Sequence, residues 1–385
     1  MSLFLISFFL VYSCMHAYAF LKARSAFGIR AWTSIFIMVF MLLMVLAPII
    51  VRLSERAGYQ TSARIAAYVG YSWLGIIFLF FSVSLAADLY RLLVKICGFA
   101  LHRDFSHLII SARNSFILAI VISISIAVYG YFEASNIRTE RLSIKTSKIP
   151  KELDRFRIVQ ISDVHLGLIV REERLNKILT EVKKAEPDML VSTGDLVDGD
   201  ICNMKAPEGL LAEIKPAYGK FAVTGNHEFY AGFEEARCFT ENAGFKLLRG
   251  ETVIMDGIMN IAGVDDPAGK YFGLSGDMAE KELLSSLPRE RFTILLKHRP
   301  VFDRNALGLF DLQLSGHVHK GQIFPFSLVT KLYYPRHAGL LKLPNHSSLY
   351  VSRGSGTWGP PIRFLSPPEV TIIDLVHEEA KYPKE

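Results

Sequence analysis

Four long hydrophobic stretches without charged residues occupy the first third of the chain. They span residues 1–21, 31–51, 65–87 and 114–132. Each is close to the roughly 20 residues that a helix needs to cross a bilayer. Backbone groups in lipid must be hydrogen-bonded within the segment, which predicts helices. Buried core helices are the alternative, but these keep a polar face that the four stretches lack. We therefore expect four transmembrane helices within residues 1–133.

The basic residues between these stretches indicate an orientation. The first connection carries Lys22, Arg24 and Arg30, the second Arg52, Arg56 and Arg64, and the third Arg91, Lys95, Arg103 and Arg113. The positive-inside rule then places the first and third connections in the cytoplasm and the C-terminal domain outside it. Four basic residues that follow the last stretch (Arg138, Arg141, Lys145 and Lys148) oppose this assignment, so the opposite orientation stays open.

Beyond residue 150 the hydrophobic runs become short. They are Phe156–Ile161, Met189–Val191, Phe221–Val223, Phe292–Leu296 and Leu312–Leu314. Their length and β-branched content predict buried strands, and amphipathic stretches at 171–185 and 278–287 predict helices between them. Runs at 252–255 and 258–261 flank Asp256-Gly257 and predict a hairpin, so the second half is partly antiparallel. The expected fold class is α/β, with a four-helix transmembrane region and a soluble α/β sandwich.

These patterns divide the chain into four parts. We expect the transmembrane region at 1–133, a linker rich in Ser, Thr and Lys at 134–150, the soluble domain at 151–378 and a short tail at 379–385. The net charge of +6 belongs entirely to the transmembrane part, because Lys/Arg and Asp/Glu balance in residues 134–385. This distribution indicates a lipid bilayer as a partner and gives no reason to expect nucleic-acid binding. The chain has four cysteines and no CxxC pair, which excludes a disulfide-rich scaffold and a zinc ribbon. Cys202 and Cys238 are equally consistent with a disulfide and with two free thiols.

Polar residues follow the predicted strands abruptly. The blocks are Asp163-x-His165, Gly194-Asp195-x-x-Asp198, Gly225-Asn226-His227-Glu228, His298 and Gly316-His317-x-His319. Ligands of open α/β sheets gather at the carboxyl ends of strands. A set of Asp, His and Asn without Cys suits a divalent ion such as Mn, Fe, Zn or Co. Two such ions held close together suit phosphoryl transfer.

Together these five ordered blocks resemble the calcineurin-like metallophosphoesterase superfamily over roughly residues 150–375. The resemblance implies two divalent metal ions with a hydroxide between them as nucleophile. One ion is held by Asp163, His165 and His319, the other by Asn226, His298 and His317, and Asp195 bridges them. It further implies that His227 protonates or stabilises the leaving oxygen and that Asp198 fixes the tautomer of His227. Glu228 has either a catalytic or a structural role.

Departures from known branches of the superfamily narrow the expected substrate. Protein phosphatases of this superfamily carry an Arg directly after the second Asp of the second block, and here that position is Gly199. The absence of this Arg argues against phosphoprotein substrates. The C-terminal run from Tyr350 to Phe364 resembles a membrane-linked branch that includes UDP-2,3-diacylglucosamine pyrophosphatase-like enzymes and transmembrane proteins with a metallophosphoesterase domain. Within and near it, Arg353, Arg363 and Lys320 are candidate substrate-binding residues, and a rigid buttressing loop is the alternative for the run.

A segment between Gln322 and Ser347 combines apolar and aromatic residues with Lys331, Arg336 and Lys342. Such a composition is typical of a contact with lipid headgroups. It predicts a lip that meets the bilayer beside the site and admits an amphipathic substrate. An ordinary excursion that covers the core is the alternative.

The resulting hypothesis is a membrane-anchored, two-metal hydrolase of a phosphodiester or pyrophosphate, in a lipid-linked or nucleotide-sugar substrate. A broad phosphomonoesterase or phosphodiesterase for small soluble substrates is the main alternative. A non-catalytic membrane sensor is less consistent with the sequence, because no ligand of the five blocks is missing. The sequence names neither the natural substrate nor the physiological metal nor the oligomeric state.

Overall fold

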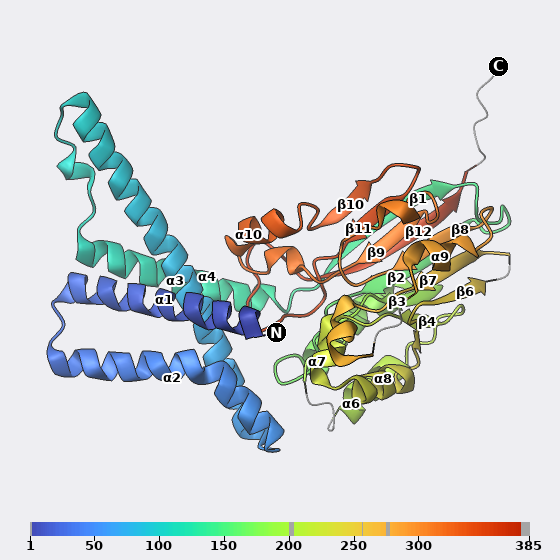
Figure 1. Cartoon of the computed structure of the whole chain (residues 1–385), viewed down its shortest axis with the longest axis horizontal. Helices are drawn as coiled ribbons and strands as arrows, with labels where there is room; N and C mark the ends of the chain where they lie inside the picture. The colour runs from blue at the N-terminus through green and yellow to red at the C-terminus, as the bar shows by residue number, and fades with distance from the viewer. Residues whose placement is uncertain (1, 200–203, 256, 275–277, 379–385) are drawn as a thin grey trace. The chain divides into compact units, whose positions relative to one another are not determined.

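A computed structural model describes residues 2–199, 204–255, 257–274 and 278–378 (Figure 1). The chain divides into two compact units. The first consists of residues 1–132 with 359–362, and the second of residues 133–358 with the chain from residue 363 onward. Cys202, Asp256 and the tail at 379–385 lie outside the described residues, so the expectations for them are not addressed.

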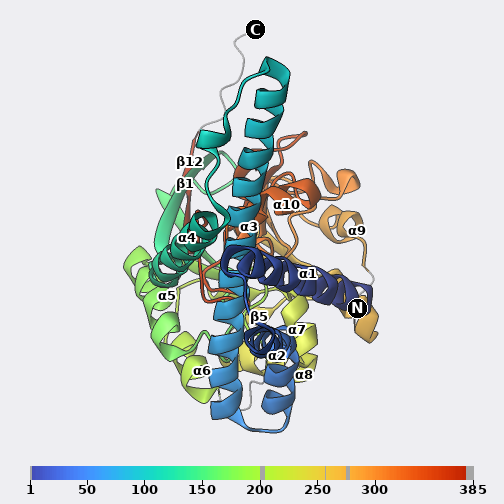
Figure 2. The same cartoon turned by 90° about the vertical axis from the view of Figure 1, so that its left-hand side faces the viewer.

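Four helices make up most of the first unit. They are α1 (Ser2–Phe27), α2 (Ala31–Arg56), α3 (Gln60–Leu101) and α4 (Ala112–Glu133), with a short 3-10 turn at Ser106–Leu108 before α4. All four are long and apolar enough to cross a membrane. Both α1 and α2 contact α3, and α1 crosses it at a large angle (Figure 2). A buried histidine, His16, accepts a hydrogen bond from the indole of Trp73 and contacts the carbonyl of Tyr12, so both ring nitrogens have partners within the helices.

Two six-stranded sheets form the second unit. The first sheet has the order β1-β12-β2-β3-β4-β5 and the second the order β10-β11-β9-β8-β7-β6. The strands of the first sheet are β1 (Arg138–Thr146), β2 (Arg155–Ile161), β3 (Met189–Ser192), β4 (Lys220–Ala222), β5 (Lys246–Leu247) and β12 (Glu369–His377). Those of the second sheet are β6 (Glu251–Met255), β7 (Met259–Gly263), β8 (Phe292–Leu296), β9 (Leu312–Ser315), β10 (Gly339–Lys342) and β11 (Ser348–Val351).

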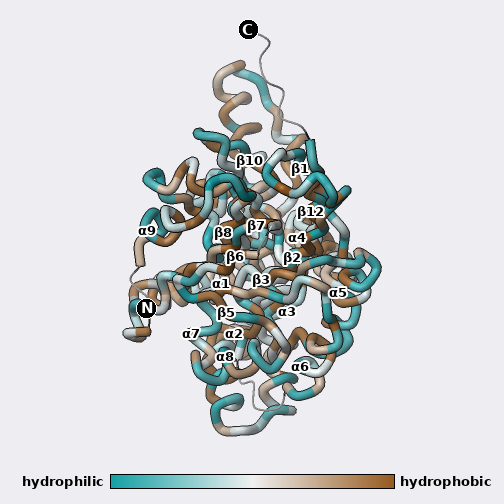
Figure 3. Tube along the Cα trace, turned by 90° about the vertical axis from the view of Figure 1, so that its right-hand side faces the viewer, coloured by the Kyte–Doolittle hydropathy of each residue, from teal (hydrophilic) through white to brown (hydrophobic). Residues whose placement is uncertain are grey.

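In the first sheet β2, β3, β4 and β5 are parallel, and β12 pairs antiparallel with β2. In the second sheet the central strands are parallel, and β6 and β10 pair antiparallel at its two edges. One large apolar cluster lies between the sheets. It contains side chains of β2, β3 and β4 from one sheet and of β7, β8 and β9 from the other. Figure 3 colours the chain by hydropathy and shows brown, hydrophobic stretches in the middle of the view, with much of the outline teal. This two-sided burial explains why the strands are nearly continuous hydrophobic runs in the sequence.

Helices lie around the sheets. They are α5 (Glu172–Ala185), α6 (Lys205–Ala212), α7 (Asn226–Ala231), α8 (Phe233–Asn242), α9 (Glu280–Ser285) and α10 (Phe326–Tyr333), with 3-10 turns at Pro267–Phe272, Arg304–Ala306 and His319–Gly321. Of these, α5 contacts β12, α8 contacts β5 and α9 packs on the second sheet. One face of α5 is buried through Leu175, Ile178 and Val182, the spacing of an amphipathic helix. Leu283 and Leu284 of α9 pack on the outer face of the second sheet with Leu295 and Leu349. The unit is thus the predicted α/β sandwich.

One segment differs from its sequence-based interpretation. Residues 134–150 are expected as a linker, but residues 138–146 form β1, which pairs in parallel with β12 along its whole length. The strand lies at the edge of the sheet, and its side chains alternate between exposed and half-buried. The half-buried Leu142 and Ile144 pack against the core between the sheets. An edge strand with one solvated face carries many polar residues, and this composition is what resembled a linker.

Candidate active site

The polar blocks that follow the strands come together at one end of the two sheets. Asp163 and His165 follow β2, and Asp195 follows β3. Asn226 and His227 begin α7 after β4, His298 follows β8, and His317 and His319 follow β9. Because these strands run parallel within each sheet, their carboxyl ends meet at the same edge. The structure therefore brings together six of the seven metal ligands that the resemblance implies, and the seventh, Asn226, follows Gly225, whose backbone lies against Asp195.

Unusual backbone conformations aim several of these side chains inward. Non-glycine residues with positive φ are Asp163 (50°), His165 (54°), Asp195 (51°), His317 (73°) and His319 (45°) among others. Non-glycine residues seldom adopt this region, and where they do the strain tends to mark a functional site. The loops also approach closely: a Cβ at Gly225 would overlap a carboxylate oxygen of Asp195, and one at Gly316 would overlap Asp163. Only glycine fits at these two positions.

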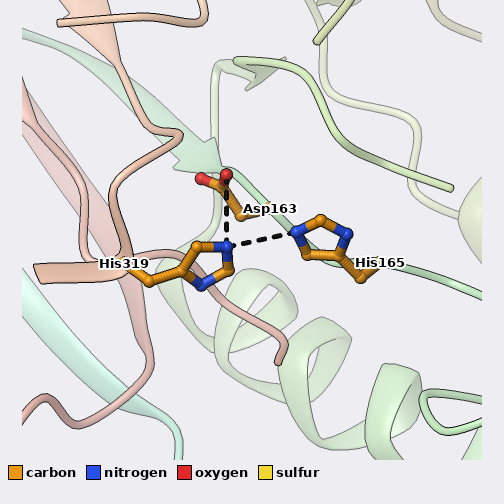
Figure 4. Close-up of side chains that lie close together, drawn as sticks. All are labelled: Asp163, His165 and His319. Carbon is orange, nitrogen blue, oxygen red and sulfur yellow. Dashed lines mark hydrogen bonds and ion pairs between the residues drawn. The ribbon is translucent and has the colours of Figure 1, made fainter. Parts of the chain in front are cut away.

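Asp163, His165 and His319 form one cluster of potential ligand atoms (Figure 4). The Nε2 atoms of the two histidines lie 3.1 Å apart, and His319 Nε2 is 3.6 Å from Asp163 Oδ1. Both oxygens of Asp163 accept from the backbone N–H of His317, and one accepts from the hydroxyl of Ser162. These bonds fix the carboxylate between the loops that follow β2 and β9.

Asp195, His298 and His317 form a second cluster. His298 Nε2 lies 3.2 Å from Asp195 Oδ2 and 3.1 Å from His317 Nδ1. Asp195 Oδ2 is also 3.8 Å from His165 Nε2, an atom of the first cluster. Asp195 therefore lies between the two clusters, the position that a bridging ligand occupies.

His227 and Asp198 lie beside these clusters. His227 Nδ1 is 2.5 Å from Asp198 Oδ1, and the ring of His227 packs edge-on against that of His165. Burial lowers the pKa of His227, but the carboxylates of Asp195 and Asp198 outweigh it and raise the pKa to about 9. Burial raises the pKa of Asp198, but His227 and His165 lower it to about 2. The pair is therefore charged near neutral pH, with His227 Nδ1 donating to Asp198.

The remaining histidines differ in protonation. His298 Nδ1 lies 2.8 Å from the carbonyl of Thr193 and so carries a proton. Its Nε2 faces Asp195; burial lowers the pKa of His298, but this carboxylate outweighs burial and raises the pKa to about 10 in the metal-free site. Burial lowers the pKa values of His317 and His319 well below the ordinary range. A neutral imidazole is the form that binds metal ions.

Glu228 has a structural position in this site. Its buried carboxylate accepts backbone N–H groups of Asp195, Leu196 and Val197 from the loop after β3, and of Gly225 from the loop after β4. It thus ties together the two loops that carry Asp195 and Asn226. The sequence left open whether Glu228 is catalytic or structural, and these contacts favour the structural role.

The donor set fits divalent cations. Among the described residues, Asn226 Oδ1 and His165 Nδ1 are buried without a hydrogen-bond partner, an arrangement that a ligand would relieve. Nitrogen atoms of neighbouring histidines point at one another at hydrogen-bond distance in both clusters. The buried carboxylates of Asp163 and Asp195 require nearby positive charge. Asp, Asn and His are the ligands that borderline divalent ions accept.

The structure corrects two predicted substrate contacts. Arg353 forms ion pairs with Glu140 and Glu369, in the first sheet. Arg363 is fully buried and donates to the carbonyl oxygens of Gly356 and Arg353 and to His319 Nδ1. Neither guanidinium is available to grip a phosphate. Lys320, the third candidate, is half-buried in the turn that contains His319, and its role as a substrate contact stays a prediction.

Three aromatic side chains beside the site were not singled out as site residues from the sequence. The rings of Tyr230 and Trp358 lie edge-on to His227, with ring centroids 5.5 Å and 5.8 Å away. The ring of Tyr334 lies edge-on to His317 at 5.6 Å. The signal for Tyr230 was its place three residues after His227 on α7, whereas no local signal identifies Trp358 or Tyr334.

Comparisons with known proteins agree with this geometry. A family model described as calcineurin-like phosphoesterase matches residues 156–321. A metallophosphoesterase of Aquifex aeolicus (strain VF5) is 40% identical over 255 residues, which cover 66% of this chain and 97% of the relative. The chain belongs to the metallophosphoesterase family. A further metallophosphoesterase, from Campylobacter jejuni, is 32% identical over 80% of this chain and 83% of its own length.

This metallophosphoesterase also resembles membrane proteins of animals. A transmembrane protein with metallophosphoesterase domain from Danio rerio is 32% identical over 67% of this chain and 62% of its own length. The four apolar helices and this relative identify a membrane protein. The family identifies a metal-dependent phosphoester hydrolase.

Proposed function

We propose that this membrane-anchored metallophosphoesterase hydrolyses a phosphodiester or pyrophosphate bond with two divalent cations, in a lipid-linked or nucleotide-sugar substrate. The observation that carries the proposal is the position of Asp195, which forms one group of ligand atoms with His298 and His317 and another with His165 and His227. Asp163, His165 and His319 would hold one ion, and His298, His317 and the unpartnered Oδ1 of Asn226 the other. When bound, such ions activate water and neutralise the charge that develops on phosphorus.

His227 supplies the proton in this proposal. A water oxygen bonds to phosphorus and loses one proton to solvent, the bond from phosphorus to the leaving oxygen breaks, and a proton from His227 Nε2 passes to that oxygen. In the metal-free site burial lowers the pKa of His227, but the carboxylates of Asp195 and Asp198 outweigh it and raise the pKa to about 9, which favours the protonated imidazole. Asp198 holds Nδ1 and so leaves Nε2 for the substrate. The rings of Tyr230 and Trp358 restrict how His227 can turn.

The domain lies outside the cytoplasm in this proposal. Seven basic residues lie in or beside the connections after α1 and α3, and three lie beside the connection after α2. Contacts between α1 and α3 show that the two helices run in the same general direction. His16 contacts Trp73, and Lys22, which comes later in α1, contacts Asp88, which comes later in α3. This direction supports placing the connections that follow the two helices on one side of the membrane. An outward domain would meet substrates of the outer leaflet or of the space beyond it.

The function is tested by hydrolysis with the purified full-length protein after metal stripping and Mn²⁺ addition. The probes are bis-p-nitrophenyl phosphate, p-nitrophenyl phosphate and UDP-2,3-diacylglucosamine. We expect turnover of the diester or the pyrophosphate to exceed that of the monoester. His227→Ala should lower kcat by about 10²–10⁴-fold, the usual contribution of a general acid, while the bound metal measured by mass spectrometry stays unchanged. His346→Ala, an exposed histidine outside the site, is the matched control.

Each outcome decides between the candidate functions. Preference for the monoester would reject the diester or pyrophosphate assignment and favour the broad esterase. Equal activity of His227→Ala and His346→Ala would remove His227 from the chemistry. Bound metal without turnover of any probe would favour a binding role for the domain.

A further inference from the structure

An exposed apolar surface lies on α10 and the chain beside it. Among the large side chains of this helix, Leu332 and Tyr333 are 80% and 79% exposed, and Thr330 is its one buried residue. We name as the α10 surface the exposed apolar side chains Phe324, Phe326, Leu328, Val329, Leu332, Tyr333 and Leu340. Contiguous apolar surface of this kind on a folded domain marks an interaction site.

The charge around the α10 surface favours a lipid partner. Residues 322–347 contain no Asp or Glu, while Lys331 and Lys342 are exposed among the apolar side chains. Apolar side chains that insert at headgroup depth, together with basic side chains that meet anionic lipid, are typical of helices lying in a membrane interface. A second copy of this chain would bring the same positive charge to the contact, which disfavours self-association through this surface.

The α10 surface is continuous with the candidate active site. The backbone of Gly321, two residues after His319, touches Ser327 so closely that a Cβ there would overlap it. Tyr334, directly after α10, packs its ring against His317. On the other side, Gln322 exchanges hydrogen bonds with the backbone of Trp358, whose ring packs against His227. A molecule held at the α10 surface is therefore next to the residues that perform the chemistry.

A bilayer lies within reach of the domain. Helix α4 ends at Glu133 and β1 begins at Arg138. The residues between them can extend over about 18 Å at most. Since α4 is one of the helices that identify a membrane protein, the second unit stays close to the membrane surface whatever its orientation.

We propose that the α10 surface inserts into the headgroup region of the bilayer and that the site takes a phosphoester held in that bilayer. The second part rests on the proposed hydrolase function, and the first does not. The substrate class is then an amphipathic phosphodiester or pyrophosphate, whose phosphorus reaches the site between Tyr334 and Trp358 while its acyl chains stay in lipid.

The membrane contact is tested without catalysis. The test uses the full-length chain with its four native cysteines replaced by serine and a single new cysteine, Leu332→Cys. An environment-sensitive fluorophore is attached to this cysteine, and the protein is reconstituted in nanodiscs that contain anionic lipid. Lipids with a nitroxide near the headgroup should quench this fluorophore at least about threefold more than one at Ile254→Cys. Ile254 is an exposed apolar residue on β6, at the opposite edge of the second sheet from β10. Equal quenching at the two positions would overturn the proposal.

The substrate class is tested by kinetics in the same nanodiscs. Leu332→Glu should lower turnover of UDP-2,3-diacylglucosamine held in the bilayer by about tenfold, comparable to the burial of one large apolar side chain. It should leave hydrolysis of soluble bis-p-nitrophenyl phosphate unchanged, as should Ile254→Glu for both probes. Equal loss on both probes, or turnover of the soluble probe alone by the unmodified protein, would reject the bilayer-held substrate. Quenching at residue 332 in a protein that hydrolyses neither probe would reject the hydrolase function and keep the membrane contact.

Discussion

Asp198 and His227 form an ion pair whose contribution to stability depends on both protonation states. The pKa of His227 is raised from 6.5 to about 9, so its contribution is complete below pH 6.5 and is lost as the pH rises through 9. The pKa of Asp198 is lowered from 3.8 to about 2, so its contribution is complete above pH 3.8 and is lost as the pH falls through 2. The pair therefore stabilises the metal-free protein most between about pH 4 and 6.5.

We predict that Asp198→Asn destabilises the metal-free protein most in that window. The loss should be about 2 kcal/mol, because a hydrogen bond to a charged group is removed. In a domain of this size it corresponds to a decrease of about 4–8 °C in Tm. Melting curves of the stripped protein and of Asp198→Asn, recorded from pH 5 to pH 10, measure the difference. A Tm difference that stays constant through pH 9 would contradict the assigned pKa of His227.

The candidate ligands could be predicted from sequence because each follows a strand whose hydrophobic run ends abruptly. Asp163 and Asp195 need no knowledge of tertiary contacts beyond the rule that parallel strands end together. Arg363 could not be predicted in the same way. Its Gly- and Pro-rich surroundings suggested an exposed phosphate contact, whereas the guanidinium is buried and donates to His319 Nδ1. Burial of an arginine depends on carbonyl groups supplied by a folded loop, and no local pattern reports them.

At the scale of elements, the edge of the first sheet is held by ion pairs of Arg353. This arginine joins Glu140 of β1 to Glu369 of β12. The side chain of Glu369 is almost fully buried and also accepts the hydroxyl of Tyr350. The pairing of β1 with β12 escaped sequence analysis because the two strands lie more than 220 residues apart in the chain.

We predict that Arg353→Gln destabilises the fold and leaves substrate binding intact. Removal of the guanidinium strands the buried carboxylate of Glu369, which should cost about 3 kcal/mol. Glu140→Gln is the matched control: it removes only a partly exposed partner and should cost less than about 1 kcal/mol. Thermal unfolding and the KM for bis-p-nitrophenyl phosphate are measured on both variants. An unchanged Tm with a KM raised tenfold or more would restore Arg353 as a phosphate contact.

At the scale of the whole molecule, the orientation of the second unit decides which lipid leaflet its site can serve. With four spans, the connections after α1 and α3 share one side and the domain after α4 lies on the other. Seven Lys and Arg residues lie in or beside those two connections and three beside the connection after α2, which favours the cytoplasm for the first two. The basic residues of β1, which oppose this assignment, belong to a folded sheet and not to a flexible loop, and folded domains contribute little to the rule.

We therefore predict that a cysteine in the second unit is labelled from outside the cell. Tyr271→Cys replaces a side chain that is 85% exposed, and Arg103→Cys places the same probe in the connection before α4. A charged maleimide that does not cross the bilayer should modify Tyr271→Cys in intact cells and Arg103→Cys only after permeabilisation. The labelling of each variant is compared with that of the parent chain. The reverse pattern would place the site in the cytoplasm. The α10 surface would then contact the inner leaflet, and the phosphoester held there would have to be a cytoplasmic product of lipid synthesis or turnover.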